Sequence, residues 1–238
     1  MTGWHGAFNL RDVGGLPIVG GGTTPVGRVF RSGAPEWMTE RGWDEARSAG
    51  LTTIVDLRNA PSETQRLPHH PVVDPARFAF VNIVNTPTED PDDESFMEVC
   101  GPWLDHPRSY SDNLAFYPAK FAAVFEAIAA SDGPVLVHCA GGKDRTGMII
   151  AMLLSFAGVD RDAIVGDYDA AFRTANALMA DDPTHHRRYA RSPEELDDWM
   201  IQRTAAMHDW LAVLDVGAYL RSAGLPEQTI ERLRTLLV

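Results

Sequence analysis

The distribution of apolar and polar positions divides the chain into three stretches. Residues 1–36 are rich in glycine and turn residues, with short apolar pieces such as 29–31 that predict short strands. From about 37 to 158, apolar β-branched runs alternate with segments of helical periodicity. From about 159 to 238 the apolar positions recur at helical spacing only. This order predicts a single α/β domain, with a mainly parallel sheet flanked by helices and a helical C-terminal extension or lid.

Local signals place the elements within these stretches. Thr39 is a good N-cap, and Gly50 a good terminator, for a helix over 40–49. The connection over 85–116 is long, acidic at 89–94 and rich in proline, which is typical of a functional or mobile segment. We expect further strands at 51–57, 78–84 and 134–138, and further helices at 96–100, 117–130 and 146–157.

Composition and charge fit a soluble globular protein and limit its partners. Hydrophobic residues make up 45% of the 238 residues and charged residues 23%, which is ordinary for one elaborated domain. The formal net charge of −12 repels nucleic acid and anionic lipid, so we expect no nucleic-acid partner and no stable membrane association. The N-terminus lacks a signal-peptide pattern, no apolar run reaches the ~18–20 residues of a membrane span, and two cysteines are too few for a disulfide framework. We expect a cytoplasmic location; non-classical secretion and the oligomeric state stay open.

The candidate chemistry is concentrated in the loop that follows the expected strand at 134–138. Cys139 and Arg145 stand six positions apart there, just before an apolar helix. Gly141 and Gly142 allow the loop to curl so that successive backbone N–H groups converge into a nest for an anion. The N-terminus of the following helix and the planar guanidinium of Arg145 add attraction for phosphate.

The same loop is suited to nucleophilic catalysis. Converging N–H groups and the cationic Lys143 and Arg145 favour the thiolate of Cys139. The thiolate can attack phosphorus in line with the leaving oxygen, and water then hydrolyses the phosphocysteine intermediate. The hydroxyl of Thr146 can donate a hydrogen bond to the sulfur, and no metal or cofactor is required. With Cys139 and Arg145 as catalytic residues, we expect phosphate to be bound by Ala140, Gly141, Gly142, Lys143 and Thr146.

Residues 138–147 read HCAGGKDRTG, which resembles the HCxxGKDRTG signature of the bacterial atypical protein tyrosine/serine phosphatases. Some members of this family also accept phosphoserine and phosphoinositides. The resemblance implies the cysteine-phosphatase fold, a parallel sheet flanked by helices, and a protein phosphatase activity. It extends over nearly the whole chain, through segments at 9–12, 28–32, 55–58, 167–168 and 219–225.

The proton donor to the leaving oxygen is the least defined part of this site. Some relatives carry an aspartate soon after the third strand, whereas residues 82–86 of this chain contain no acid. Asp144 lies in the loop, matches the family signature and is our first choice as general acid. Its cationic neighbours would lower the pKa of its carboxyl group, so an orienting role stays open, as does a general acid from the segment 89–94.

Several other polar residues could extend the cationic pocket, because the family fold would bring their segments near the loop. Arg31 is the first candidate to bind substrate, followed by Arg11 and Arg58. Asp56, at the carboxyl end of a strand, lies where ligands bind in open α/β sheets. Each of these side chains could equally form a structural ion pair. Near-helical spacing predicts core or lid packing, rather than a cofactor site, for Trp199, Met200, Met207 and Trp210.

These observations favour a phosphatase for phosphate monoesters, with protein phosphotyrosine as the first substrate and phosphoserine, phosphothreonine or phosphoinositides as further ones. A phosphatase for small metabolites, such as nucleotide or sugar phosphates, is the alternative on the same scaffold. A phosphate-binding pseudo-enzyme is a weaker hypothesis, because a binder does not need the thiolate of Cys139. A rhodanese-type sulfurtransferase also sets a cysteine in an anion-cradling loop, but the spacing to Arg145 and the following Thr146 disfavours it.

Overall fold

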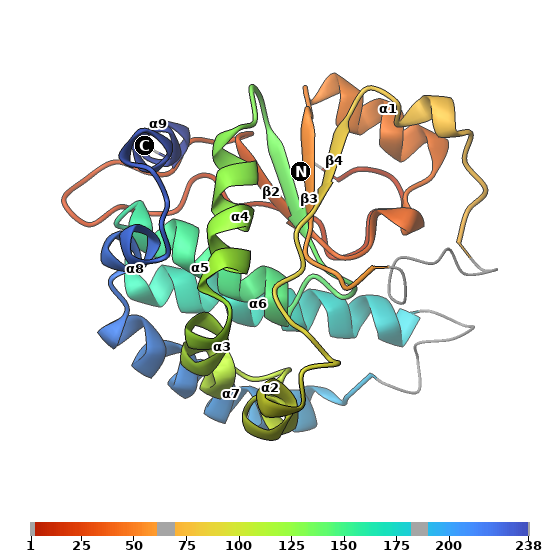
Figure 1. Ribbon diagram of the computed structural model, residues 1–238. Coiled ribbons are helices and arrows are strands. Elements are labelled where there is room, and N and C mark those ends of the chain that lie inside the picture. Colours follow the sequence, from red (N-terminus) through yellow and green to blue (C-terminus); the bar gives the residue numbers. More distant parts are fainter. Residues whose placement is uncertain (1–2, 61–69, 182–189, 238) are drawn as a thin grey trace.

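A five-stranded sheet lies at the centre of the molecule (Figure 1). The computed structural model describes residues 3–60, 70–181 and 190–237. In sheet order the strands are β1 (Arg11–Asp12), β2 (Val29–Ser32), β5 (Val135–His138), β3 (Thr53–Asp56) and β4 (Asn82–Asn85), with β1 antiparallel to β2 and the other pairs parallel. The helices are α1 (Glu40–Ser48), α2 (Glu94–Val99), α3 (Tyr110–Phe116), α4 (Pro118–Ala129), α5 (Asp144–Phe156), α6 (Arg161–Asp181), α7 (Pro193–Val213), α8 (Val216–Ser222) and α9 (Glu227–Leu237).

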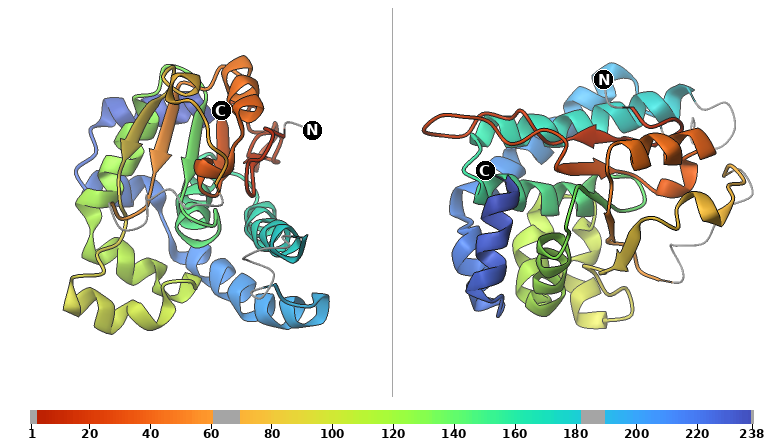
Figure 2. Two further views of the ribbon diagram at one scale, coloured as in Figure 1. Left: turned by 90° about the vertical axis from the view of Figure 1, so that its right-hand side faces the viewer. Right: turned by 90° about the horizontal axis from the view of Figure 1, so that it is seen from above.

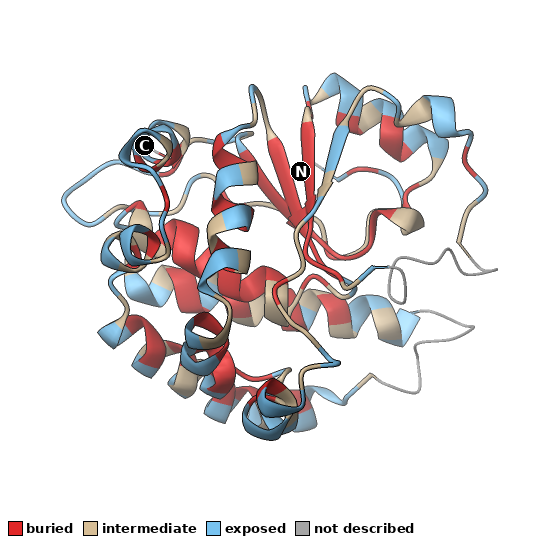
Figure 3. Ribbon diagram, in the orientation of Figure 1, coloured by how far each residue is buried: buried red, intermediate tan, exposed pale blue. Residues whose placement is uncertain are grey.

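Helices cover both faces of the sheet. Successive strand residues point to opposite sides, and apolar residues on both sides need cover. In β5, Leu136 packs with Trp43 of α1 on one face. The next residue, Val137, belongs to a larger apolar cluster on the other face, together with Phe125 of α4 and Ile150 of α5. Helices α6, α8 and α9 pack on α5 and α7 packs on α6, so the C-terminal helices form a further layer (Figure 2). The inner strands and α5 are the most buried elements (Figure 3), and no described helix is long and apolar enough to cross a membrane.

The predicted α/β class, its parallel sheet and its helical C-terminal part are confirmed, with one shifted strand and one missed helix. The strand expected over 78–84 is instead Asn82–Asn85. Phe78 packs on Trp43, with ring centroids 5.1 Å apart, so the apolar residues ahead of β4 cover α1 rather than pair in the sheet. Within 85–116 the sequence predicted one short helix, but α3 also forms there because it packs between α2 and α4.

The parallel strands bring four chain segments to one edge of the sheet. Because β2, β3, β4 and β5 run in the same direction, the residues that follow them meet at their carboxyl ends. These segments begin at Gly33, Leu57, Thr86 and Cys139. Cys139 follows β5, which lies between β2 and β3, so neighbouring segments flank its loop. In open α/β sheets this edge is where ligands bind.

Candidate active site

The loop from Cys139 to Lys143 is held by hydrogen bonds to four consecutive carbonyl oxygens. These bonds run from His138 Nδ1 to Cys139 O (3.1 Å), Ala34 N to Ala140 O (2.9 Å), Asn9 Nδ2 to Gly141 O (3.0 Å) and Arg31 Nη2 to Gly142 O (2.9 Å). Because a trans peptide directs its N–H opposite to its C=O, the N–H groups of residues 140–143 are turned away from these donors. Within the described part of the chain those N–H groups donate no hydrogen bond. The loop therefore offers a row of N–H donors to an anion.

Two glycines allow the loop to lie this close to β2. Gly142 has a φ of +65°, and a Cβ there would come within 2.5 Å of the backbone of Ser32. A Cβ on Gly33 would come within 2.9 Å of the carbonyl oxygen of Ala140. A side chain at either position would push the loop away from the donors that fix its carbonyl groups.

A buried ion-pair cluster joins the loop to α6. The fully buried Arg31 donates to the carbonyl of Gly142 and pairs with the carboxylate of Asp167. Arg11 pairs with the same carboxylate at 3.0 Å and also donates to the backbone carbonyl of Asp167. Burial alone would raise the pKa of Asp167, but the two guanidinium groups hold that pKa below its ordinary value. Asp167 therefore stays ionised and pairs with both arginines.

A cavity of about 280 Å³ opens on the other side of the loop. Cys139 reaches it with only 4% of its surface exposed. Nε of Arg145 lies 3.6 Å from the carboxylate of Glu89, which belongs to the segment after β4. The cavity thus brings the thiol, the guanidinium and several carboxyl groups together; it is lined by Glu89, Leu104, Asp105, Cys139, Gly141, Lys143, Asp144 and Arg145.

Asp144, the first residue of α5, is the candidate proton donor in this cavity. Burial raises the pKa of its carboxyl group to about 6, although Lys143, Arg203 and Arg145 act in the opposite direction. Lys143 and Arg145 thus lower this pKa as expected, but the net shift is upward because desolvation outweighs them. Oδ1 of Asp144 is shielded from solvent and has no hydrogen-bond partner among the described residues. A carboxyl group that holds its proton to near-neutral pH is suited to general-acid catalysis.

Four residues expected near the substrate, Arg31, Arg11, Arg58 and Asp56, lie outside this cavity. Arg31 and Arg11 face the buried ion-pair cluster instead. Asp56 accepts hydrogen bonds from Nε (2.9 Å) and Nη2 (2.8 Å) of Arg58 and lies 3.7 Å from Nε2 of His138. All four take part in structural ion pairs, which was the alternative considered for them.

The hydroxyl of Thr146 is also placed differently from the prediction. The side chain is fully buried, and its Oγ1 has no hydrogen-bond partner among the described residues, so the expected bond to the sulfur of Cys139 is not formed. What Thr146 offers the site is the backbone N–H of the first turn of α5, which has no partner within its own helix.

Sequence reasoning missed four contributors to the site. Asn9 and Asp167 lie in segments that resemble the family, but nothing in their spacing indicates that they meet at the loop. Leu104 and Asp105 line the cavity and belong to the stretch 85–116. The length of that connection was its only signal of function.

The thiol of Cys139 lies beside a row of N–H donors, an arrangement that can hold an oxyanion such as phosphate. The chain belongs to the tyrosine phosphatase family, whose model matches residues 2–238. The resemblance of its loop to the bacterial atypical tyrosine phosphatases is thereby confirmed.

Two relatives by sequence agree with this membership. The triple specificity protein phosphatase PtpB of Mycobacterium tuberculosis is 26% identical over 274 aligned positions, which cover 98% of this chain and 97% of that protein. A tyrosine-protein phosphatase of Nostoc commune is 32% identical and covers 84% of this chain and 70% of its own length. Among solved structures, TpbA of P. aeruginosa in complex with pTyr covers 84% of this chain and 88% of its own, with 15% identity and a TM-score of 0.38.

Proposed function

We propose that the chain is a cysteine-dependent protein phosphatase that hydrolyses phosphotyrosine through a phosphocysteine intermediate. The observation that carries this proposal is the set of four tethered carbonyl groups, which turns the N–H groups of residues 140–143 to one side of the loop, next to Cys139. These donors and Arg145 can bind the three non-bridging phosphate oxygens. The name of the Mycobacterium tuberculosis relative, a triple specificity protein phosphatase, supports an activity that is broader than phosphotyrosine alone.

The reaction proceeds in two displacements. The thiolate of Cys139 attacks phosphorus, the S–P bond forms, and the bond to the tyrosine oxygen breaks while Asp144 gives its proton to that oxygen. A water molecule then attacks phosphorus, loses a proton to the carboxylate of Asp144, and the S–P bond breaks to return the thiolate and inorganic phosphate. Arg145 and the loop N–H groups stabilise the charge on the equatorial oxygens in both transition states.

The shape of the cavity supports an aromatic phosphate ester. Cys139 is nearly buried, so a phosphate must stand well away from the peptide backbone to reach its sulfur. The phenyl ring of phosphotyrosine provides that reach, and Leu104 supplies an apolar wall for it. A reduced thiol at Cys139 also fits the cytoplasmic location that the sequence predicts.

Replacing the nucleophile tests the mechanism. Cys139→Ser should lower kcat for p-nitrophenyl phosphate by at least about 10⁴-fold, since a serine hydroxyl is not ionised at neutral pH. Vanadate should still bind, because the nest of N–H groups is unchanged. Cys100→Ser is the matched control: Cys100 is fully buried, does not line the cavity, and burial raises its pKa to about 11.

Two results would contradict the proposal. Retention of most activity in Cys139→Ser would remove the phosphocysteine intermediate, and equal loss in Cys100→Ser would point to a general effect on folding. The substrate class is tested separately with phosphotyrosine peptides against nucleotide and sugar phosphates. Faster turnover of the small phosphates would assign the enzyme to metabolites instead.

A further inference from the structure

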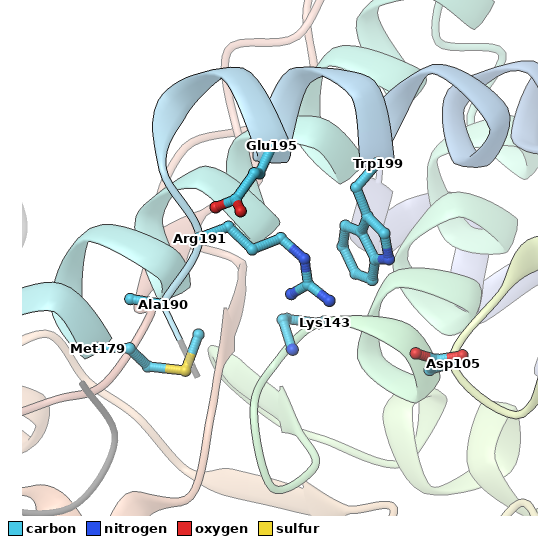
Figure 4. Close-up of a pocket in the computed structure, with 7 residues that line it drawn as sticks. All are labelled: Asp105, Lys143, Met179, Ala190, Arg191, Glu195 and Trp199. Carbon is cyan, nitrogen blue, oxygen red and sulfur yellow. The ribbon is translucent and has the colours of Figure 1, made fainter. Parts of the chain in front are cut away.

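A second and larger cavity, of about 680 Å³, adjoins the active-site cavity (Figure 4). The two cavities share Asp105 and Lys143, so a ligand bound at Cys139 can extend into the second one without crossing the protein. Figure 4 shows the guanidinium of Arg191 directed into this space, between Lys143 and Trp199. Among the residues that the structure describes, Met179, Ala190 and Glu195 also line it.

The cationic groups of this cavity are available to a ligand. Neither Lys143 nor Arg191 forms an ion pair with any residue in the described parts of the chain. Both instead lie over aromatic rings: Nζ of Lys143 is 5.3 Å from the centroid of Phe172, and Cζ of Arg191 is 4.2 Å from that of Trp199. In a chain of net charge −12, two such cations beside the catalytic loop are a specific feature.

Arg191 is also held in place by its backbone. The side chain of Asn176 on α6 accepts from the N–H of Arg191 at 2.8 Å and donates to its carbonyl oxygen at 2.9 Å. A guanidinium stacked on an indole keeps its N–H edges free to bind an anion. The site is therefore largely formed before any ligand arrives.

The two carboxylates in the lining accept hydrogen bonds from groups other than Lys143 and Arg191, and Glu195 acts on Arg191 only through its charge. Asp105 accepts a hydrogen bond from Arg203 at 3.0 Å. Glu195 accepts from the backbone N–H of Ser192 at 2.9 Å, as part of the capping box that begins α7. An entering anion meets Lys143 and Arg191 as the groups without carboxylate partners.

We propose that this second cavity binds a second phosphate of a peptide substrate, so that doubly phosphorylated peptides are preferred over singly phosphorylated ones. The inference rests on the proposed phosphotyrosine phosphatase function. A peptide runs past the active site in both directions, so a phosphorylated side chain near the phosphotyrosine can reach Arg191. Phosphate suits the planar fork of Arg191 and the point charge of Lys143 together. The acidic surface repels an anionic bilayer, which favours a peptide over a lipid.

The experiment compares kcat/KM for a phosphotyrosine peptide with that for a series in which a phosphoserine is moved residue by residue away from the phosphotyrosine on either side. The wild type should prefer at least one of these registers by roughly tenfold, the effect of one good charge-assisted contact. Arg191→Gln should remove the preference. Arg173→Gln should keep it, because this arginine of α6 already pairs with Asp169 and Asp197 and its loss changes the net charge equally.

The possible outcomes distinguish failure of the second phosphate site from failure of the proposed phosphatase function. Hydrolysis of all peptides at similar kcat/KM, or a preference that survives Arg191→Gln, would overturn the second site and leave the phosphatase intact. Turnover of p-nitrophenyl phosphate without turnover of any peptide would overturn the peptide substrate and the second site together. If Arg191→Gln slowed only the hydrolysis of phosphatidylinositol phosphate in vesicles, the cavity would belong to a lipid headgroup and the proposal would be wrong.

Discussion

Cationic side chains lie on both sides of the 139–145 loop, but the two sides differ in whether those side chains form ion pairs. Behind the loop, Arg31 and Arg11 both pair with the single carboxylate of Asp167. On the cavity side, Arg145 pairs with Glu89, but Lys143 lies over an aromatic ring, without an ion-pair partner in the described structure. The rear therefore holds its arginines in ion pairs within the fold, whereas the front leaves Lys143 and the loop N–H donors for an anion.

This difference assigns a separate task to each side. A buried ion pair contributes little net stability, because desolvation of the charges offsets their attraction. The pair of Arg31 and Asp167 is better understood as a device that fixes the carbonyl of Gly142, and so the direction of the loop N–H groups. Substitutions in front should then change rate alone, while substitutions behind should change both rate and stability.

Among these substitutions, the largest change in rate is expected for Arg145, on the cavity side of the loop. Arg145→Lys keeps the charge but loses the planar fork, and should lower kcat by about 10²–10³-fold. The thermal midpoint should stay close to that of the wild type, because the side chain borders the cavity. Steady-state kinetics and thermal unfolding measured on one preparation test both parts. A large fall in the thermal midpoint would contradict the view that substitutions on the cavity side change the rate alone.

The next largest effect, on both stability and rate, is expected behind the loop. Asp167→Asn leaves the buried Arg31 without its counter-ion and should cost about 3 kcal/mol of unfolding free energy, together with a loss of kcat. Asp169→Asn is the matched control, since its partner Arg173 is largely exposed.

The pH dependence of Asp167→Asn sharpens this test. The folded-state pKa of Asp167 is lowered, so its contribution to stability is present above the ordinary aspartate pKa of about 4 and is lost as the pH falls further. Denaturant unfolding at several pH values should show the gap between wild type and variant narrowing towards acid. A gap that is constant with pH would argue against the ion pair as its cause.

The smallest effect concerns the proton donor. Asp144→Asn should slow alkyl phosphates by about 10²-fold more than p-nitrophenyl phosphate, whose leaving group needs no proton. A general acid must be protonated, and the pKa of Asp144 is raised to about 6, so wild-type turnover of alkyl phosphates should fall as the pH rises through 6. That alkaline limb should flatten in the variant.

A matched variant distinguishes Asp144 from the acidic segment. Glu89 lines the cavity beside Arg145, whereas Asp90 pairs with Lys120 at 3.5 Å and does not line it. If Glu89→Gln showed the dependence on the leaving group and Asp144→Asn slowed all substrates evenly, Glu89 would be the acid. Asp144 would then serve only to orient the loop.

Much of the front of the site could be predicted from the sequence, because its residues are contiguous. The spacing of Cys139 and Arg145, the glycines between them, and the strand and helix on either side all lie within one short segment. Strand and helix periodicity likewise predicted the sheet and the helical C-terminal part.

The contacts behind the loop could not be predicted, because the residues that make them come from distant segments of the chain. Asn9, Arg31 and Asp167 meet only when β1, β2 and α6 are packed together, and a sequence pattern does not encode such a meeting. The pKa of Asp144 was misjudged for a related reason. Its charged neighbours are visible in the sequence, but the desolvation that outweighs them depends on the folded environment.

The bonds that hold the loop have a consequence for folding. Two of them, from Asn9 to Gly141 and from Arg31 to Gly142, join residues 132 and 111 positions apart in the chain, and the ion pair of Arg31 with Asp167 behind them joins residues 136 positions apart. Contacts this distant close large loops of disordered chain at a high entropic cost, so they form late, after the local helices and turns. An incompletely folded chain therefore carries the thiol of Cys139 without the row of N–H donors beside it, and we expect phosphatase activity to appear only with the last contacts of the native state.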